Sequence, residues 1–322
     1  MDSVFQRIQP SEYCKRFLEF QIRPDGRHLG EVRDVRVMKN VLKESPSVIG
    51  SSIVSAGHSR FLAAVTAEIA PPVLSAPKAG KIVVNLEFPK TCGALDVNRD
   101  AGEDIASLAA QTSVSLCHIF SSQEVIDLKQ FCVKEGNAVW VLYVNIICLE
   151  YDGNATDWSI CSAAAALEDS VLPAIVWDPK HQWWRISDDN DESDNKDELE
   201  TQKTENTFWE SRRVVLTARP LSVTLAKLLE TYWIVDPSMD ETQLGELITI
   251  WRATKADPTD ATSNQLHFLR PGGSALEVQR LLHSLFEVSH NGMVAMQTAI
   301  DNAVKKEGVD MWEVCCSDGD TD

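Results

Sequence analysis

The sequence lacks the short motifs by which many enzymes and metal sites are recognised. None of its eight cysteines forms a C-x-x-C pair, and none of its seven histidines stands at metal-ligand spacing from another. It contains no G-x-G-x-x-G, G-x-S-x-G or H-E-x-x-H, and Gly80-Lys81 is followed by Ile82, so the phosphate-binding loop motif is incomplete. The common dinucleotide-binding, nucleotide-hydrolysing, zinc-protease and serine-hydrolase classes therefore find no support.

Long apolar runs and positive charge are also scarce. No run reaches the roughly 18 apolar residues that span a bilayer, and residues 1–9 show no apolar stretch behind a basic start, so we expect neither a membrane span nor a secretory signal. The chain has 30 basic and 48 acidic residues, a formal net charge of -18. This charge argues against a protein that binds nucleic acid without a partner. Most cysteines lie in apolar segments, which favours buried free thiols in a reducing compartment over disulfides or zinc ligands.

Acidic residues are concentrated in two places. The stretch Asp188–Glu205 carries nine acidic residues against two lysines and almost no apolar side chain. Such a composition cannot offset the entropy lost on ordering, so residues 187–207 are predicted to form a disordered acidic loop. Residues 305–322 are predicted to be an acidic tail. The remaining chain is long enough for two moderate domains with cores of their own.

Alternating and β-branched runs predict two blocks of strands, each followed by helix. In the first block the central strand is almost wholly apolar, as expected for a strand covered on both faces, and Asp157 is expected to cap the alanine-rich helix after it. The second block ends in a long helix that starts with the capping-box spacing Ser274 to Glu277. This order favours an α+β fold with two related lobes over a doubly wound sheet. The predicted strands are 32–37, 47–54, 60–69, 81–88, 139–149, 213–217, 222–225, 233–235 and 247–251, and the predicted helices are 102–120, 157–171 and 274–304.

One turn, Arg23-Pro-Asp-Gly-Arg27, stands between an amphipathic run at 13–20 and the segment 29–33. Pro24 fixes φ and Gly26 accepts a positive φ, which makes a sharp turn but does not reveal a function. In this frame, however, the sequence resembles the RNase PH family, and within it the ring subunits of the RNA exosome. The resemblance covers about residues 5–300 without the acidic loop, and it rests also on Val139–Tyr143, Cys148–Asn154, Ile234–Pro237 and Pro271–Ser274.

The resemblance implies an RNase PH fold, made of two β-β-α-type lobes like domain 2 of ribosomal protein S5. It divides the chain into an N-terminal helix and turn at 1–30, a first lobe at 31–173 and a second lobe with its C-terminal helix at 208–304. The acidic loop lies between the two lobes, and the acidic tail follows the second.

The resemblance also implies where a catalytic site would lie. Active relatives hold orthophosphate with backbone N–H groups and an arginine that closely follows glycines, and they hold a metal with two acids six residues apart. Here Gly153 and Asn154 occupy the loop, but the arginine's place falls on Thr156. Asp236 matches the first acid, whereas the second falls on Thr242. We therefore expect a vestigial phosphate and metal site, with no bound metal, no cofactor and no catalysis.

Three other features leave alternatives open. Asp240 and Glu241 form a shifted acid pair that could bind magnesium, although a plain turn accounts for them better. Arg99, with Lys90 just before its loop, is the predicted RNA contact, and it lies between two aspartates. The tryptophans at 183, 184 and 209 could stack on bases, but their acidic surroundings favour an anchor for the loop or a protein contact.

The resemblance predicts a non-catalytic ring subunit that supports 3′-to-5′ RNA processing and degradation by other subunits. Its expected partners are other RNase PH-like ring subunits, the S1/KH cap subunits, and single-stranded RNA in the assembled channel. Its expected locations are nucleus, nucleolus and cytoplasm. The alternatives are an active phosphorolytic exoribonuclease with a rearranged site, and an acidic interaction protein outside any exosome.

Overall fold

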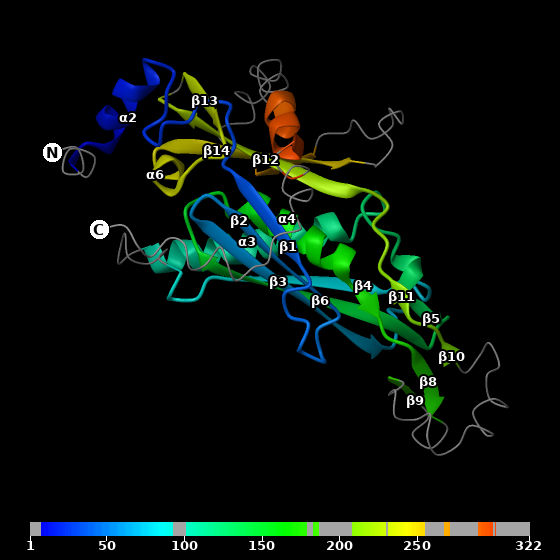
Figure 1. Cartoon of the computed structure of the whole chain (residues 1–322). Coiled ribbons are helices and arrows are strands. Elements are labelled where there is room, and N and C mark those ends of the chain that lie inside the picture. The colour runs from blue at the N-terminus through cyan, green and yellow to red at the C-terminus, as the bar shows by residue number, and fades with distance from the viewer. Residues whose placement is uncertain are drawn as a thin grey trace.

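The computed structural model describes residues 8–92, 101–178, 183–186, 208–229, 231–254, 267–270, 289–298 and 300. Two main sheets lie on either side of a central helix, and a small third sheet lies at one end of the molecule (Figure 1). Among the described helices, none combines the length and the apolar character needed to cross a bilayer. The acidic loop, the acidic tail and the first turns of the predicted C-terminal helix, with Ser274 and Glu277, lie outside the described residues.

The first lobe is a six-stranded sheet in the order β1-β2-β3-β6-β4, with β5 paired to β6. Neighbouring strands are antiparallel except β4 and β6. The central strand β6 (Ala138–Glu150) is buried on both faces only in its first half, because Asn145, Ile147 and Leu149 are exposed. The prediction of a strand covered throughout was therefore wrong for its second half. The other elements of this lobe are β1 (Val35–Lys39), β2 (Gly50–Ala56), β3 (Ser59–Ala70), β4 (Lys81–Glu87), α3 (Ala101–Phe120), η1 (Leu128–Phe131) and β5 (Cys132–Lys134).

The helix α4 (Ala155–Asp169) packs between the two main sheets, against β2 and β3 on one side and β12 (Arg219–Leu228) on the other (Figure 1). Its alanines are buried, and their small side chains allow the sheets to approach closely. The hydroxyl of Ser52 on β2 donates to the carbonyl of Ser162 on α4 at 2.7 Å. A Cβ on Gly50 would lie 2.3 Å from the Ser170 hydroxyl oxygen, so no larger residue fits there without movement.

The second lobe is a four-stranded sheet in the order β13-β12-β14-β15. The strand predicted at 213–217 is reduced to β11 (Arg212–Arg213), which pairs with β7 (Val171–Leu172). It stops early because Val215 exchanges two backbone hydrogen bonds with the side chain of Gln130, both at 3.0 Å. The remaining elements are β12 (Arg219–Leu228), β13 (Tyr232–Val235), α6 (Met239–Thr242), β14 (Gly245–Thr254), β15 (His267–Arg270) and a helix over 289–298.

The N-terminal helix α2 (Pro10–Leu18) packs on the second lobe, although the first lobe follows it in the chain. Cys14 and Leu18 are buried against Ala226, Leu228 and Ile234 of β12 and β13. Figure 1 shows α2 in blue beside these late strands. The first residues of the chain therefore help to complete the core of the last lobe.

A small sheet that the sequence did not predict has the strand order β10-β8-β9. It is made of β8 (Ile175–Asp178), β9 (Trp183–Ile186) and β10 (Phe208–Trp209). Trp184 and Trp209 are buried, and the Trp209 ring lies 5.9 Å from that of Trp140 on β6. Trp184 and Trp209 therefore anchor this sheet to the first lobe and are not available as a base-stacking platform.

The packing of α2 predicts unequal effects of two neighbouring substitutions. Leu18→Ala should lower the free energy of unfolding by about 2–5 kcal/mol, because the side chain is fully buried and its removal leaves a cavity. Phe20→Ala is the matched control, since the Phe20 side chain is 79% exposed, and it should change stability by less than about 0.5 kcal/mol. Urea unfolding followed by circular dichroism measures both, and equal effects would contradict the packing described.

Candidate functional site

The loop before α4 adopts a conformation that few residue types tolerate. Gly153 has a φ of +81° and Asn154, the N-cap of α4, has a φ of +56°. Asp157 is not the N-cap, so that prediction was wrong. It is the third residue of the helix, in its first turn, and it is buried; its carboxylate accepts hydrogen bonds from the Thr224 backbone N–H at 2.7 Å and hydroxyl at 3.1 Å. Because Thr224 is on β12, Asp157 joins the two lobes.

Gly153 is required by the approach of the second lobe as well as by its own backbone angle. A Cβ at this position would lie 2.5 Å from the backbone carbon of Ser238 and 2.7 Å from the carbonyl oxygen of Pro237. Both atoms belong to backbone that cannot move aside cheaply. The glycine therefore has a structural explanation that needs no bound phosphate.

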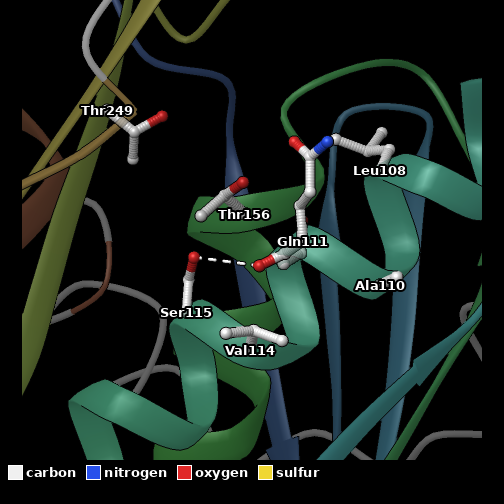
Figure 2. A pocket seen from close by; sticks show the side chains of 8 residues that line it. Leu108, Ala110, Gln111, Val114, Ser115, Thr156 and Thr249 are labelled. Atoms are coloured by element: carbon white, nitrogen blue, oxygen red, sulfur yellow. Dashed lines mark hydrogen bonds between the residues drawn. The ribbon is translucent and has the colours of Figure 1, made fainter.

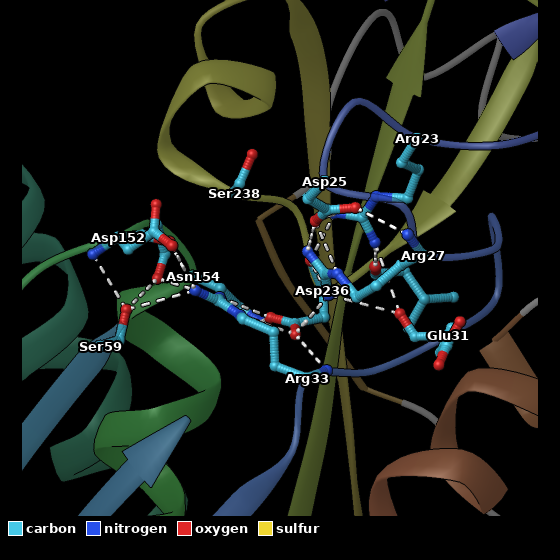
Figure 3. A network of polar contacts seen from close by, with 12 residues as sticks. Arg23, Asp25, Arg27, Glu31, Arg33, Ser59, Asp152, Asn154, Asp236 and Ser238 are labelled. Carbon is cyan, nitrogen blue, oxygen red and sulfur yellow. Dashed lines mark hydrogen bonds and ion pairs between the residues drawn. The ribbon is translucent and has the colours of Figure 1, made fainter. Parts of the chain in front are cut away.

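The carboxylate of Asp236 is fully buried and accepts hydrogen bonds from three side chains. Arg33 donates from Nε at 2.9 Å and from a terminal nitrogen at 2.7 Å, and its backbone N–H donates at 3.0 Å. Arg27 donates at 3.1 Å and the Asn154 amide at 2.7 Å. Figure 3 shows these groups converging on Asp236. Both carboxylate oxygens are thus occupied by the protein's own donors.

Arg33 also reaches the first lobe. Its guanidinium donates to the carbonyl of Asp152 at 2.6 Å, and more weakly to the hydroxyl of Ser59 at 3.3 Å. The same guanidinium lies 5.8 Å from the ring centroid of Trp158 on α4. One side chain therefore connects the loop before α4 to the loop after β13.

A second buried ion pair fixes the neighbouring turn. Arg23 is fully buried, and it binds the Glu241 carboxylate with two guanidinium nitrogens, one of them Nε at 2.9 Å. It also donates to the carbonyls of Val235 at 2.8 Å and Asp236 at 3.0 Å. Glu241 in turn accepts from the backbone N–H and hydroxyl of Ser238, which closes a capping box on α6. The Glu241 carboxylate is therefore already paired with Arg23, so it is not available to bind a metal together with Asp240.

The two threonines that replace expected functional groups lie apart from this network. The Thr242 hydroxyl donates to the carbonyl of Met239 at 2.7 Å within α6. Thr156 lines a cleft of about 420 Å³ between α3, the start of α4 and β14 (Figure 2). The lining side chains are all uncharged: Leu108, Ala110, Gln111, Thr112, Val114, Ser115, Thr156 and Thr249. An anion entering here would meet hydroxyl, amide and apolar groups but no cation among the described lining residues.

The structure therefore brings together Gly153, Asn154 and Asp236 and leaves Thr156 and Thr242 outside their network. Lys90 is exposed in the turn after β4, away from these contacts, and Arg99 lies outside the described residues. In the part of the chain that the structure describes, no group of three or more His, Cys, Asp or Glu side chains is arranged to hold a metal.

Burial and pairing shift the pKa values of Asp236 and Asp157 in opposite directions. Burial alone would raise the pKa of Asp236, but the hydrogen bonds and charges of Arg33, Asn154 and Arg27 hold it below its usual 3.8. Burial likewise opposes the charge of Arg33, yet Asp236 raises its pKa. Burial raises the pKa of Asp157 to about 6, although hydrogen bonds, among them that from the Thr224 backbone N–H, act to lower it.

Sequence analysis missed the role of the arginines at 23, 27 and 33. It recognised the turn that carries the first two, but not that their guanidinium groups fill the place next to Asp236. The available signal was the density of arginine in this segment. Asp25 pairs with Arg27 at 2.6 Å, but Glu241 and Asp236, which pair with Arg23 and Arg33, lie more than 200 residues away in the sequence.

Three comparisons with known proteins agree with this architecture. Residues 31–173 match the family described as "3' exoribonuclease family, domain 1". Over 92% of this chain and 98% of the other, the fold matches a chain of a solved "Archaeal exosome core" with a TM-score of 0.66 and 22% sequence identity. The first lobe thus matches the domain that the sequence predicted, and the whole chain shares the predicted fold with that archaeal chain.

Two relatives named as exosome components are also similar to this chain in sequence. The chain is 35% identical to "Exosome complex component rrp43" of Schizosaccharomyces pombe over 176 residues, which is 55% of this chain and 63% of that protein. It is 26% identical to "Exosome complex component Rrp42" of Archaeoglobus fulgidus over 270 residues, which is 84% of this chain and 87% of that one. Among exosome ring subunits, the sequence itself predicts most similarity to the one called ribosomal RNA-processing protein 43, and the match to the fission yeast protein confirms that similarity.

Gly153→Ala should be far more damaging than Gly26→Ala. Both glycines have positive φ, +81° and +87°, but a Cβ on Gly26 meets nothing within 4 Å. Gly26→Ala should therefore cost about 1 kcal/mol of backbone strain, whereas Gly153→Ala adds a collision with the second lobe and should cost at least about 3 kcal/mol. Urea unfolding of the two variants checks this, and equal costs would remove the close-approach explanation.

The raised pKa of Asp157 predicts that its contribution to the free energy of unfolding decreases as pH rises. Between its usual pKa of 3.8 and about 6 in the folded state, the folded protein binds the proton more tightly than the unfolded chain. Its contribution to the free energy of unfolding therefore falls by about 2–3 kcal/mol over this range and stays low above it. Asp157→Asn should abolish this fall.

The control for that measurement is Asp25→Asn. The Asp25 carboxyl is partly exposed, and hydrogen bonds and charge from Arg27 outweigh burial and lower its pKa, so its contribution to stability changes with pH in the opposite direction to that of Asp157. Unfolding in urea at several pH values from 4 to 7 compares the two variants with the wild type. A wild-type slope retained by Asp157→Asn would show that another group carries it.

Proposed function

We propose that this protein is a non-catalytic structural subunit of an RNA exosome core ring. In this role it supports 3′-to-5′ RNA processing and degradation, such as ribosomal RNA maturation and messenger RNA turnover, that other subunits carry out. Its partners are other RNase PH-like subunits of the ring and the S1/KH subunits that cap it. Single-stranded RNA passes through the assembled channel and binds this chain weakly on its own.

The observation that carries the proposal is the occupied state of Asp236. In a phosphorolytic enzyme, carboxylates at this position must hold a metal that offsets the charge of the reacting phosphates. Here both oxygens of Asp236 already accept hydrogen bonds from Arg33, Arg27 and Asn154. A metal ion could bind only by displacing two guanidinium groups from a buried carboxylate, which leaves buried charges without partners.

The cleft beside Thr156 supports the same conclusion. Orthophosphate binding needs a cation or several aimed N–H groups, because the anion must leave water to reach the site. The described lining residues offer none of the arginine or lysine side chains that would provide that attraction. The proposal therefore rests on two independent deficits, of metal ligands and of positive charge.

The similarity to named exosome components supports the assembly role. Both the fission yeast and the archaeal relatives are called exosome complex components, and the fold extends over nearly the whole of an archaeal core chain. The match to the fission yeast protein covers less than two thirds of that protein's length, so the partners named above are part of the proposal. The proposal includes action in nucleus, nucleolus and cytoplasm, which imaging of a fluorescent fusion would test.

An activity assay tests the catalytic half of the proposal. The purified chain is incubated with uniformly labelled single-stranded RNA, orthophosphate and Mg²⁺, beside an active phosphorolytic RNase as a positive control. We expect no nucleoside diphosphates above the level of a protein-free blank, because neither phosphate nor metal finds its ligands. Release of nucleoside diphosphates in proportion to the amount of chain would overturn this half.

A second measurement tests the assembly half. The chain is affinity-purified from its own cells in mild salt and the bound proteins are identified by mass spectrometry. We expect RNase PH-like and S1/KH proteins in near-equal amounts to the bait. Their absence, with the bait intact and folded, would sink the ring role even if the chain proved inactive.

A further inference from the structure

Two buried cysteines come together near the ends of β4 and β6. These strands are parallel neighbours, and Glu87, the last residue of β4, pairs with Ile147 of β6 (Figure 1). The chain turns after β4, and Cys92 lies in this turn with only 3% of its surface exposed. Cys148 follows Ile147 on β6 and is fully buried. Strand pairing therefore brings two thiols that are far apart in the sequence to the same end of the first sheet.

Several contacts hold Cys92 against the end of β6. The backbone N–H of Tyr151 donates to the Cys92 carbonyl at 3.0 Å, and the rings of Phe88 and Tyr151 meet edge to face at 5.3 Å. The Cys148 thiol donates to the Glu150 carbonyl at 3.3 Å. The same thiol has the Cys92 side chain as a hydrogen-bonding and electrostatic neighbour. The two side chains therefore face each other.

This arrangement meets the main geometric requirement for a disulfide. Two cysteines can be bridged without backbone movement only when their backbones already lie close together and their side chains point toward each other. Here the backbone of Cys92 is hydrogen-bonded to Tyr151, just beyond the strand that carries Cys148, and both side chains belong to one core cluster. Formation of an S–S bond therefore requires only a small local adjustment.

Cys92 is the more accessible of the two thiols by its place in the chain. Lys90 and Thr91, just before it, are exposed, and the turn is closed by a backbone hydrogen bond from Cys92 to the Pro89 carbonyl at 3.1 Å. Local opening of such a turn costs much less free energy than global unfolding. Burial, and then the Cys92 side chain, raises the pKa of Cys148, so Cys148 stays protonated in the core. Cys92 is therefore the thiol that meets an oxidant first.

We propose that Cys92 and Cys148 form a modification site, at which a peroxide oxidises the two thiols to a disulfide. The Cys92 sulfur attacks the peroxide and breaks its O–O bond, which gives a sulfenic acid and, with hydrogen peroxide, one water. The Cys148 sulfur then attacks the sulfenic sulfur, so that the S–S bond forms and a second water leaves with the Cys148 thiol proton. Two electrons thus pass from the thiols to the peroxide, and a thiol reductant such as glutathione returns them.

The disulfide fixes the turn after β4 to β6, where the reduced chain has only noncovalent contacts. Tyr151 leads directly into Asp152 and Gly153, whose carbonyls accept hydrogen bonds from Arg33. Oxidation therefore adds a covalent bond beside the loop that joins the two lobes, and reduction removes it. The inference does not depend on the ring role.

Disulfide mapping of the full-length chain tests the site. The reduced protein is treated with hydrogen peroxide under native conditions, free thiols are blocked, and unreduced tryptic peptides are identified by mass spectrometry. We expect the peptides that contain Cys92 and Cys148 to be linked, and dithiothreitol to separate them. Cys92→Ser should abolish the link. Cys148→Ala should also abolish it, although Cys161 remains in the same tryptic peptide.

Limited proteolysis tests what the disulfide does to the turn. Endoproteinase Lys-C cuts after Lys90, and cleavage within a folded chain requires local opening around the cut. We expect oxidation to slow this cut by about fivefold or more, with recovery in dithiothreitol and no slowing in Cys92→Ser. Cleavage after Lys78, which is exposed in the connection before β4, is the matched control and should keep its rate.

Thermal melting confirms that the variants are folded, and the mapping of the wild-type chain does not depend on them. The absence of a link between Cys92 and Cys148 under native conditions, or its appearance only in urea, would overturn the site. Oxidation of other thiols in its place would do the same. A link that forms while the cut after Lys90 keeps its rate would overturn the proposed restraint of the turn.

Discussion

The carboxylate of Asp236 is the group on which the arrangement of the two lobes depends. It lies after the last residue of β13, fully buried, and receives the guanidinium of Arg33 from the start of the first lobe and the amide of Asn154 from the cap of α4. A buried ion pair adds little net stability relative to an apolar pair, but removal of one partner leaves an uncompensated charge. The network therefore specifies how the lobes meet more than it strengthens them.

The same hydrogen bonds determine whether the Asp236 carboxylate can bind a metal ion. Asp236 has the residue type that a metal site needs, yet its neighbours supply positive charge where a metal ion would. Glu241, the other acid in this turn, is committed to Arg23 and to the cap of α6. The buried acids Asp236 and Glu241 of this turn are therefore both paired with arginines of the same chain.

Sequence patterns predicted those elements whose periodicity is local. The runs at 60–69 and 81–88, the helix at 102–120 and the glycine loop at 153 were found because alternation, amphipathic spacing and turn residues are visible within a few positions. The burial of Arg23 could not be read in this way, because its partner Glu241 is 218 residues distant. Asp157 was assigned to a cap by its place before a helix, whereas tertiary contact with Thr224 turned it inward. The small sheet escaped notice because its strands are shorter than any periodic signal.

The packing of α2 and Arg23 on the second lobe has a consequence for how the chain matures on the ribosome. The helix and its following turn are synthesised first, but the surfaces that bury Leu18 and Arg23 are synthesised some two hundred residues later. Until β12, β13 and α6 have been synthesised, the apolar side chain of Leu18 and the charged side chain of Arg23 remain exposed to water. This segment can therefore reach its buried position only after the second lobe has been synthesised.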